Sequence, residues 1–392
     1  MKDLLKERSR RAVVENAERL ISLSHRIHEH PETAWHEINA ASWITDELRR
    51  SNFIVNEIAD LPTAFIASIG SGDLHIAICA EYDALPGVGH ACGHNIIAAA
   101  AVGAGIGLAN LANEIGARVS IVGTPAEEGA GGKIYMLERG VFDDVDAAMM
   151  IHPAPVNVAR ADPFSVSHFR VTFTGKAAHA ATYPDEGINA ADAFIVAEVA
   201  IGLLRQQLPA NARVHGVVTK AGDAPNVIAD LSEGRWYVRG ATLKDLDAIE
   251  SRVRACFEAG ALATGCMLRI EPEGPRYSEF KNDEAMLALF VANSNVLGRI
   301  FEPSSPQSQM NRASTDMGNV SLVVPSIHPY LGIDSLPATN HQREFADHCV
   351  SESADAAVLD GAIAMAWTAI DMATTHSIRV RLIKLGDSNL KS

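Results

Sequence analysis

A cysteine and a histidine stand two residues apart in the stretch Gly-His-Ala-Cys-Gly-His-Asn, residues 89–95. Because side chains of an extended loop point the same way at every second residue, Cys92 and His94 can face a common point. A thiolate and an imidazole together suit zinc or another divalent transition ion. A buried cysteine beside a histidine that caps the apolar helix predicted at 96–111 is the alternative, so other residues must decide.

Two adjacent glutamates, Glu127 and Glu128, follow Thr-Pro-Ala and precede a glycine. Adjacent carboxylates repel each other, which favours a cation beside them. In an extended loop the two side chains diverge, so that one can bind a metal while the other acts as general base on a metal-bound water. Two solvated loop acids are the simpler alternative.

These polar stretches come at the ends of predicted strands. Apolar runs, typical of a sheet covered on both faces, predict strands at 64–68, 75–80, 118–123 and 146–151. Open α/β sheets place their sites at the carboxyl ends of strands. Asp83, after the second strand, could orient a metal-bound histidine or cap a turn, and His152, at the end of the fourth, could be a ligand or a core histidine. The three strand ends together predict one convergent site.

The other elements of this α/β domain, a mixed sheet with helices on both faces, follow from apolar periodicity. Helices are predicted at 8–29, 39–50, 283–297 and 350–373. A polar glycine turn leads into an apolar strand within 309–324, residues 326–345 are irregular, and a partly frayed tail occupies 380–392.

The rhythm of the sequence changes after residue 162. The pattern predicts a strand at 166–172, a helix at 189–207, strands at 214–220 and 226–239, a helix at 243–264 and a strand at 267–271. This β-α-β-β-α-β order is that of a ferredoxin-like α+β unit. We therefore predict a catalytic domain formed by residues 1–162 and 276–392, with an inserted domain at 163–275.

Composition limits the classes of function. The chain has 392 residues, 47% hydrophobic and 21% charged, a length that favours two domains. A formal net charge of -15 argues against nucleic acid and anionic membranes as partners. Five scattered cysteines argue against a disulfide framework and for a reducing compartment. Without an apolar leader or a long uninterrupted apolar run, we expect a cytoplasmic protein that does not span a membrane.

Taken together, the motifs resemble the metal-dependent amidohydrolase and peptidase family of aminoacylases and glutamate-releasing carboxypeptidases. The nearest resemblance is to the subgroup with bacterial N-acyl-amino-acid and aminobenzoyl-glutamate hydrolases and plant auxin-conjugate hydrolases. It spans nearly the whole chain, in the same order. The matching stretches are 80–86, 90–95, 125–129, 151–152, 175–180, 224–228 and His341 ahead of Glu344-Phe345.

This resemblance implies a centre of two divalent metal ions, manganese or zinc, with cobalt and nickel as alternatives. The ligands would be Cys92 as the bridging group and His94, Glu128, His152 and His341. Glu127 would be the general base, and Asp83 would orient a ligand. Because the segment around His341 departs from the family's commonest form, His328 competes with it as the last ligand, although we favour His341.

The resemblance also implies how substrate is held. His179 in the inserted domain would reach the substrate, often from the partner subunit of a homodimer, and Asn226 and Arg239 would help to bind it. Two residues depart from the pattern: Asn95 stands where many relatives have aspartate, and Glu81 stands where many have aspartate. Because Asn95 is neutral, one negative charge near the metals is in doubt.

We expect an amidohydrolase that cleaves the amide bond of an N-acyl or N-aroyl amino acid, or of a dipeptide-like conjugate. A hydrolytic deaminase of an aromatic amine could use the same site. A non-catalytic binding subunit is a rival that the complete ligand set disfavours. A thiol protein for redox chemistry or zinc storage would leave the Glu127–Glu128 pair unexplained.

Overall fold

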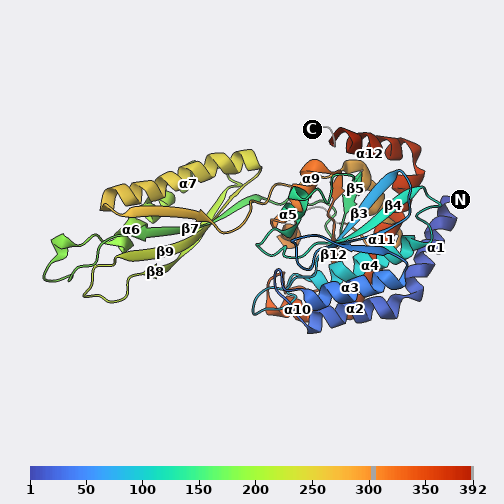
Figure 1. Cartoon of the computed structure of the whole chain (residues 1–392), viewed down its shortest axis with the longest axis horizontal. Helices are drawn as coiled ribbons and strands as arrows, with labels where there is room; N and C mark the ends of the chain where they lie inside the picture. The colour runs from blue at the N-terminus through green and yellow to red at the C-terminus, as the bar shows by residue number, and fades with distance from the viewer. Residues whose placement is uncertain (302–305, 390–392) are drawn as a thin grey trace. The chain divides into compact units, whose positions relative to one another are not determined.

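The computed structural model of the chain describes residues 1–301 and 306–389. It divides into two compact units, a first unit made of Met1–Asp162 and Phe280–Ser392 and a second unit made of Pro163–Glu279. Both are drawn in Figure 1. The second unit ends at Glu279, whereas the predicted insertion ends at residue 275.

The first unit is built on a mixed sheet of six strands: β1 (Ile54–Glu57), β2 (Phe65–Ile69), β3 (Leu74–Ala80), β4 (Ala117–Gly123), β5 (Ala147–Met149) and β11 (Ser326–Ile327). The spatial order is β1-β2-β4-β3-β5-β11. The last four strands of this order are parallel, and β2 and β1 extend the sheet as antiparallel strands. The carboxyl ends of β3, β4 and β5 therefore share one edge.

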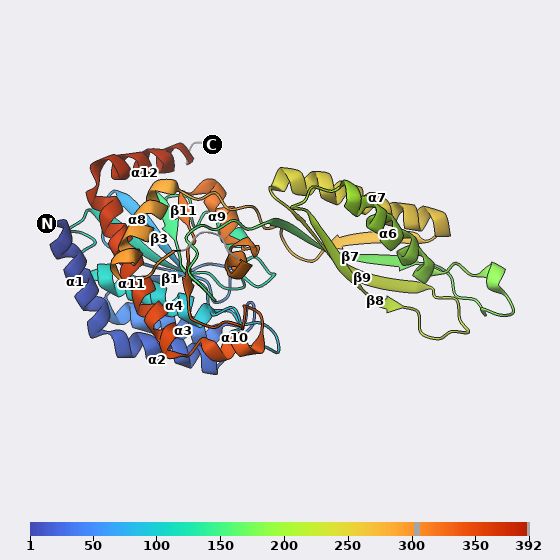
Figure 2. The same ribbon diagram turned by 180° about the vertical axis from the view of Figure 1, so that it is seen from behind.

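Helices cover both faces of this sheet, as predicted. Along β3, Ile76 and Ile78 belong to one hydrophobic core while Ala77 and Cys79 belong to another, as alternation along a strand requires. The first core is completed by α1 (Lys2–Glu15), α2 (Ala17–Glu29), α3 (Ile38–Arg50), α4 (His94–Ala109), α8 (Glu284–Val296), α11 (Glu352–Thr374) and α12 (His376–Asn389). The second core is completed by α5 (Gly132–Glu138) and α9 (Met317–Val323). Figure 2 shows α8 and α11 together on one side of the sheet.

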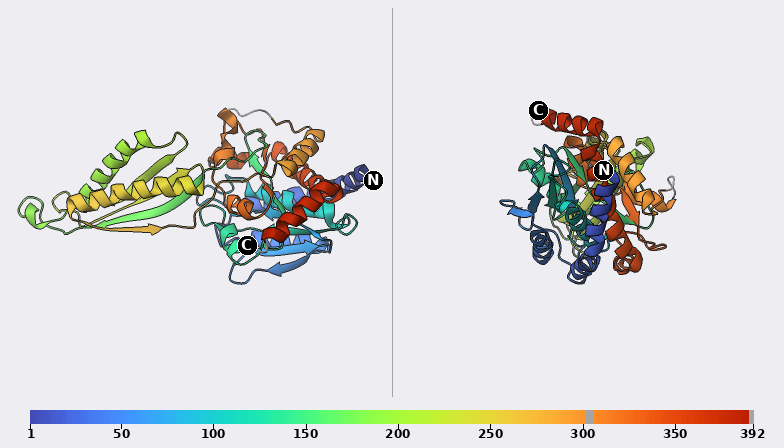
Figure 3. Two further views of the ribbon diagram at one scale, coloured as in Figure 1. Left: turned by 90° about the horizontal axis from the view of Figure 1, so that it is seen from above. Right: turned by 90° about the vertical axis from the view of Figure 1, so that its right-hand side faces the viewer.

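Helix α11 is long and apolar enough to cross a membrane, by length and composition alone. However, 83% of its most apolar window is buried within the described part of the chain. It packs against α4 and against the first helix, α1, so that the two ends of the chain meet in one core (Figure 3). Its hydropathy is that of a central core helix.

Several sequence predictions for this unit are wrong. The helix predicted at 8–29 is broken at Asn16, whose side chain donates a 2.8 Å hydrogen bond to the carbonyl oxygen of Ala12 and competes with the helical ladder. The strand predicted within 309–324 is helix α9, whose buried residues recur at helical spacing. The tail forms α12 up to Asn389, and residues 390–392 lie outside the described residues.

The region around His152 also differs from the prediction. The strand expected at 146–151 stops at Met149, and His152 opens a second short strand, β6 (His152–Ala154). Strand β6 runs parallel to β12 (Tyr330–Gly332). The stretch 326–345 is therefore not irregular, since it holds β11, β12 and the start of α10 (Arg343–His348).

The second unit is a four-stranded antiparallel sheet with two helices on one face, as α6 and α7 in Figure 2 show. Its elements are β7 (Ser165–Thr174), α6 (Ala190–Leu204), β8 (Arg213–Ala221), β9 (Leu231–Gly240), α7 (Leu243–Thr264) and β10 (Met267–Pro272). The order β10-β7-β9-β8 confirms the ferredoxin-like prediction. The strand expected at 226–239 begins only at Leu231, so Asn226 lies in the preceding loop.

Candidate metal centre

The loop that carries Cys92 and His94 is a tight turn rather than the predicted extended segment. Gly93 between them has a φ of 76° in the left-handed region, and His94 is already the first residue of α4. A Cβ atom at Gly93 would lie 2.4 Å from Cγ of Pro153. Glycine is therefore required at this position, both for its conformation and for the close approach of β6.

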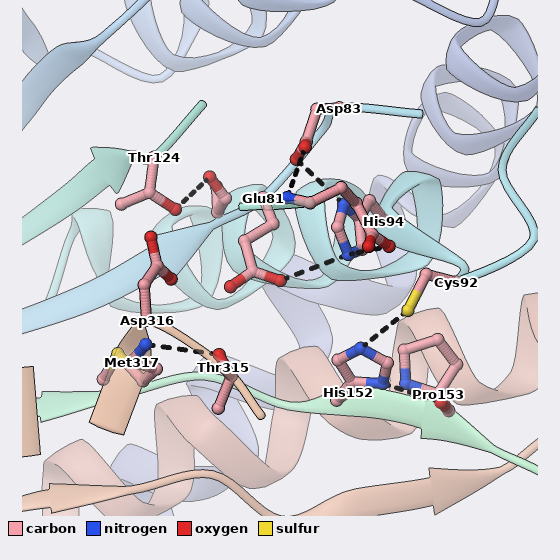
Figure 4. A network of polar contacts seen from close by, with 12 residues as sticks. Glu81, Asp83, Cys92, His94, Thr124, His152, Pro153, Thr315, Asp316 and Met317 are labelled. Atoms are coloured by element: carbon pink, nitrogen blue, oxygen red, sulfur yellow. Dashed lines mark hydrogen bonds and ion pairs between the residues drawn. The ribbon is translucent and has the colours of Figure 1, made fainter. Parts of the chain in front are cut away.

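The thiol of Cys92 is shared by two groups of ligand atoms. One group joins Cys92 to His94 and His152, and the other joins it to Glu128 and His341, with the atoms of each group within 4.8 Å of one another. The Sγ atom of Cys92 points toward His152, 3.4 Å from its Nε2 atom (Figure 4). Two three-residue groups with one thiolate in common could hold two metal ions that share Cys92 as a ligand.

His94 presents one ring nitrogen to this space. Its Nδ1 atom lies 3.0 Å from Oδ1 of Asp83, while its Nε2 atom lies 3.5 Å from Oε2 of Glu81 and 3.9 Å from Oε1 of Glu128. Figure 4 shows His94 between Asp83 and Glu81. Within the described residues, those atoms of His94, Glu81 and Glu128 are buried and have no hydrogen-bond partner.

Buried polar atoms without partners are costly, and divalent cations held by the groups that contain His94 and Glu128 would satisfy those two atoms. The donor set of thiolate, imidazole and carboxylate also fits zinc, manganese and related ions. The residues present therefore fit a metal centre. Asp83 connects its parts, because its Oδ2 atom accepts a 2.9 Å hydrogen bond from the backbone N–H of Glu128.

His341 and His328, the two candidates for the last ligand position, have different surroundings in the structure. The backbone N–H of His341 donates a 2.8 Å hydrogen bond to the carbonyl oxygen of Ala91, and its Nε2 atom lies 3.6 Å from Oε1 of Glu128. His328 instead stacks on the ring of His152, with centroids 5.5 Å apart. Among the described residues, the ligand groups that contain Cys92 include His341 and not His328.

Glu127 faces the same space from a second direction. Its carboxylate belongs to one group with His94 and Glu128, and to another with Glu81 and Asp316. Burial, followed by the charges of Glu81 and Glu128, raises the pKa of Glu127 well above its ordinary value. A nearby cation would relieve that repulsion.

The loop that presents Glu127 is held by a residue that the sequence analysis missed. The fully buried Glu37 accepts a 2.9 Å hydrogen bond from the backbone N–H of Ala126. Ala126 itself has a φ of 60°, an unusual conformation for a non-glycine residue. Lys133 and Asp316, which contact each other at 2.6 Å, were missed too. These residues are distant from their partners in sequence, and only the polar turn around Asp316 gave any signal.

The substrate residues predicted in the second unit lie in two places. His179 and Asn226 are on adjacent loops, since His179 forms a bridge with Val227 and the backbone N–H of Ala180 donates to the carbonyl oxygen of Asn226. Nδ1 of His179 accepts hydrogen bonds from the backbone of Ala181 and Thr182, so in the neutral ring the proton sits on Nε2.

Arg239 stands at the other end of the same sheet. It pairs with Val166 near the start of β7, whereas Leu231 at the beginning of β9 pairs with Thr174, the last residue of β7 before the His179 loop. Eight residues of extended chain span roughly 26 Å. Within one copy of this unit the structure therefore does not bring Arg239 together with His179 and Asn226.

Comparison with known proteins places these observations in a family. The family model described as Peptidase family M20/M25/M40 matches residues 77–359. The chain is 38% identical over 387 residues to the Xaa-Arg dipeptidase of Mus musculus, covering 94% of this chain and 89% of the relative. It is 34% identical over 275 residues to one of the subunits of the p-aminobenzoyl-glutamate hydrolase of Escherichia coli, covering 64% of this chain and 57% of that protein.

A solved structure shares the fold. A dinuclear metal-binding peptidase of the M20 family from Bacillus subtilis superposes with a TM-score of 0.68 at 24% identity, covering 90% of this chain and 98% of that one. The resemblance inferred from the sequence motifs is thus confirmed, and so is the fold class. The chain is a metal-dependent hydrolase that belongs to the peptidase family M20/M25/M40.

Proposed function

We propose that this chain hydrolyses the amide bond of a dipeptide with a basic C-terminal residue, by means of two divalent metal ions. N-acyl and N-aroyl amino acids are the related class of substrates. The observation that carries the proposal is the thiol of Cys92, common to two groups of ligand atoms beside the carboxylate of Glu127. Within this proposal His94 and His152 complete one group, and Glu128 and His341 complete the other.

Two divalent ions held by these ligands would polarise the scissile carbonyl and lower the pKa of water from about 16 toward 7. Glu127 accepts a proton from the attacking water while the water oxygen bonds to the carbonyl carbon. It then delivers that proton to the amide nitrogen as the C–N bond breaks. The products are a carboxylate and a free amine, so water is the only co-reactant.

Two observations support a basic substrate. The relative that matches 94% of this chain is named for cleaving before arginine. The formal net charge of -15 would also attract a cationic dipeptide over an anionic one. Zinc and manganese are the metals we propose, with cobalt and nickel as alternatives, because availability selects among ions that suit the same ligands.

The two ends of the second unit suggest how substrate is held. Since Arg239 lies at one end of the sheet and His179 with Asn226 at the other, a single copy cannot present all three to one substrate. We propose that the chain is a homodimer in which each site uses Arg239 from one subunit and His179 and Asn226 from its partner. The Nε2–H group of His179 would donate a hydrogen bond to an oxygen of the substrate.

The test is metal content by mass spectrometry together with a product screen. The panel contains Xaa-Arg and Xaa-Lys dipeptides, Xaa-Glu dipeptides, N-acyl and N-aroyl amino acids, and aromatic amines. Glu127→Gln is the matched control, because it removes the base and keeps the size of the side chain. We expect bound metal, release of free arginine or lysine, and a Glu127→Gln protein that binds metal without turnover.

Other results would contradict parts of this proposal. Release of ammonia without an amino acid would identify a deaminase instead. Preference for Xaa-Glu or aroyl-glutamate substrates would overturn the basic specificity but keep the amidohydrolase. Full activity of a folded Glu127→Gln protein would remove Glu127 from the role of base.

A further inference from the structure

Lys133 is a fully buried cation beneath the metal centre. It is the second residue of α5, and its side chain has no exposed surface. Its Nζ atom lies 2.5 Å from Oε1 of Glu81 and 2.6 Å from Oδ1 of Asp316. Burying a charged lysine is very costly unless it is paired and hydrogen-bonded, so this arrangement indicates a specific role.

The ion pairs of Lys133 tie together three segments that are far apart in the sequence. Glu81 directly follows β3, Asp316 directly precedes α9, and Lys133 itself follows the Glu127–Glu128 loop. Asp316 holds Lys133 at two points, because its Oδ2 atom also accepts a 2.9 Å hydrogen bond from the backbone N–H of Lys133. The start of α5 is thereby fixed to both neighbouring segments.

The loop of the proposed base is connected directly to this point. The backbone N–H of Gly132 donates a 3.1 Å hydrogen bond to the carbonyl oxygen of Ala126, the residue before Glu127. A Cβ atom at Gly132 would lie 1.8 Å from the carbonyl oxygen of Pro125, so the two backbones are in close contact. A shift of Lys133 would therefore be transmitted to Glu127.

The carboxylates around Lys133 form a cation site in their own right. Oxygen atoms of Glu81, Glu127 and Asp316 lie within 4.8 Å of one another and all three residues are buried. The ammonium group already contacts two of the three. Burial acts against its charge, but Asp316, Glu81 and Glu127 raise the pKa of Lys133 well above its ordinary value.

Glu81 connects Lys133 to His94 of the candidate metal centre. One carboxylate oxygen binds Lys133, and the other lies 3.5 Å from Nε2 of His94. Burial raises the pKa of Glu81, but the charge of Lys133 and then of His94 outweighs it and lowers the value to about 2. The single carboxylate of Glu81 therefore joins Lys133 to His94.

We propose that Lys133 is a positioning residue for the general base, as the built-in cation of the Glu81–Glu127–Asp316 cluster. It holds the Glu127 loop against the ends of β3 and α9. This inference rests on the proposed function, since it takes Glu127 as the base. Lys133 itself does not act on the substrate.

The test uses the double variant Lys133→Met/Asp316→Asn. It removes one positive and one negative charge, so the net charge of the cluster is unchanged. The asparagine keeps an oxygen that can accept the backbone hydrogen bond of residue 133. The single variant Lys133→Met leaves two carboxylates without their cation, and if it fails to fold for that reason the double variant decides. Lys281→Met, at an exposed lysine of the same unit, is the matched control.

The readouts are kcat and KM on an Xaa-Arg dipeptide, manganese content, and hydrogen exchange of the peptide that covers residues 124–133. We expect the double variant to keep its manganese and its KM. Its kcat should fall roughly a hundredfold because the base is displaced. Exchange in 124–133 should become faster. Lys281→Met should match the wild-type protein in kcat, KM, manganese content and hydrogen exchange.

A double variant with wild-type kcat would overturn the inference, because charge balance alone would then suffice. Loss of manganese would overturn it as well, since Lys133 would then support the metal ligands rather than the base. If the wild-type protein cleaves no amide, the proposed function fails on its own. The exchange of residues 124–133 separately decides whether Lys133 holds the Glu127 loop in place, and unchanged exchange would refute that.

Discussion

Nδ1 of His94 lies 3.0 Å from Oδ1 of Asp83, with both side chains buried. The second oxygen of Asp83 accepts from the backbone N–H of Glu128. One carboxylate therefore fixes the orientation of a histidine and the position of a glutamate, two of the proposed ligands. Such partners of metal-binding histidines set which ring nitrogen faces the metal.

We predict that Asp83→Asn weakens metal binding by about ten- to a hundredfold, the range typical for loss of such a partner. The asparagine has the same shape but no charge to stabilise the proton on Nδ1 of His94. Manganese affinity measured by competition with a chelator would show the change. Asp73→Asn, at an exposed aspartate of the same unit, should bind manganese like the wild-type protein. Equal affinities for all three proteins would contradict this account of Asp83.

Cys92 should affect metal content more than any other proposed ligand, because among the described residues it alone belongs to both of the groups proposed to hold the two ions. We predict that Cys92→Ala loses most of its bound metal, whereas His341→Ala retains the ion held with His94 and His152. Metal counted by mass spectrometry of the folded proteins distinguishes these cases. A His341→Ala protein as poor in metal as Cys92→Ala would mean that the two ions bind only as a pair.

How far the sequence predicts this structure depends on the range of the interactions. Strand β3 and helix α4 were predictable because each is a nearly continuous run of apolar residues, a local pattern that indicates a buried element. The strand ends then placed Cys92, Glu127 and His152 on one edge. Short elements such as α9 were not predictable, because a brief apolar run suits a helix and a strand equally well.

The sequence did not predict the buried polar contacts that support the site. The side chain of Lys133 donates a hydrogen bond to Asp316, 183 positions away in the sequence. Glu37 accepts one from the backbone N–H of Ala126, 89 positions away. Nothing in the local sequence distinguishes a buried lysine from an exposed one on a short helix. Likewise, the alternation that suggested a common direction for Cys92 and His94 gave the right grouping for the wrong reason, since the left-handed Gly93 brings them together.

Glu37 gives the protein a pH dependence of known sign. Burial, followed by the charge of Asp83, raises the pKa of Glu37 from 4.5 to about 7. Between these values the folded state holds a proton that the unfolded state has lost, so the free energy of unfolding decreases as pH rises from 4.5 through 7. The stabilisation that Glu37 contributes is fully present below pH 4.5. As the pH rises through 7, the free energy of unfolding loses on the order of 3 kcal/mol.

We predict that Glu37→Gln removes this decrease, because glutamine stays neutral and keeps an oxygen for the N–H of Ala126. Urea unfolding of the metal-free protein at several pH values measures it. Buried histidines such as His152, whose pKa burial lowers to about 3, oppose the trend. The difference between wild type and variant isolates Glu37. Exposed Glu29→Gln is the control, and a difference that does not vary between pH 4.5 and 7 would refute the prediction.

The separation of His179 and Arg239 along the second unit yields the most direct test of the proposed dimer. We predict that His179→Ala and Arg239→Ala each lose most of their kcat/KM while keeping their metal, since neither residue belongs to the ligand groups. Metal loss in His179→Ala would show that the residue has been misplaced.

The two inactive proteins should restore activity when they are mixed. In a hybrid dimer, one site combines the intact Arg239 of the first subunit with the intact His179 of the second, while the other site lacks both. Random exchange of subunits after mild denaturation and refolding would then recover about a quarter of the wild-type activity, because half of the dimers carry one working site. If both residues serve the site of their own chain, every site in the mixture lacks one of them and the mixture stays inactive. Refolding each variant alone is the control, and it should recover no activity.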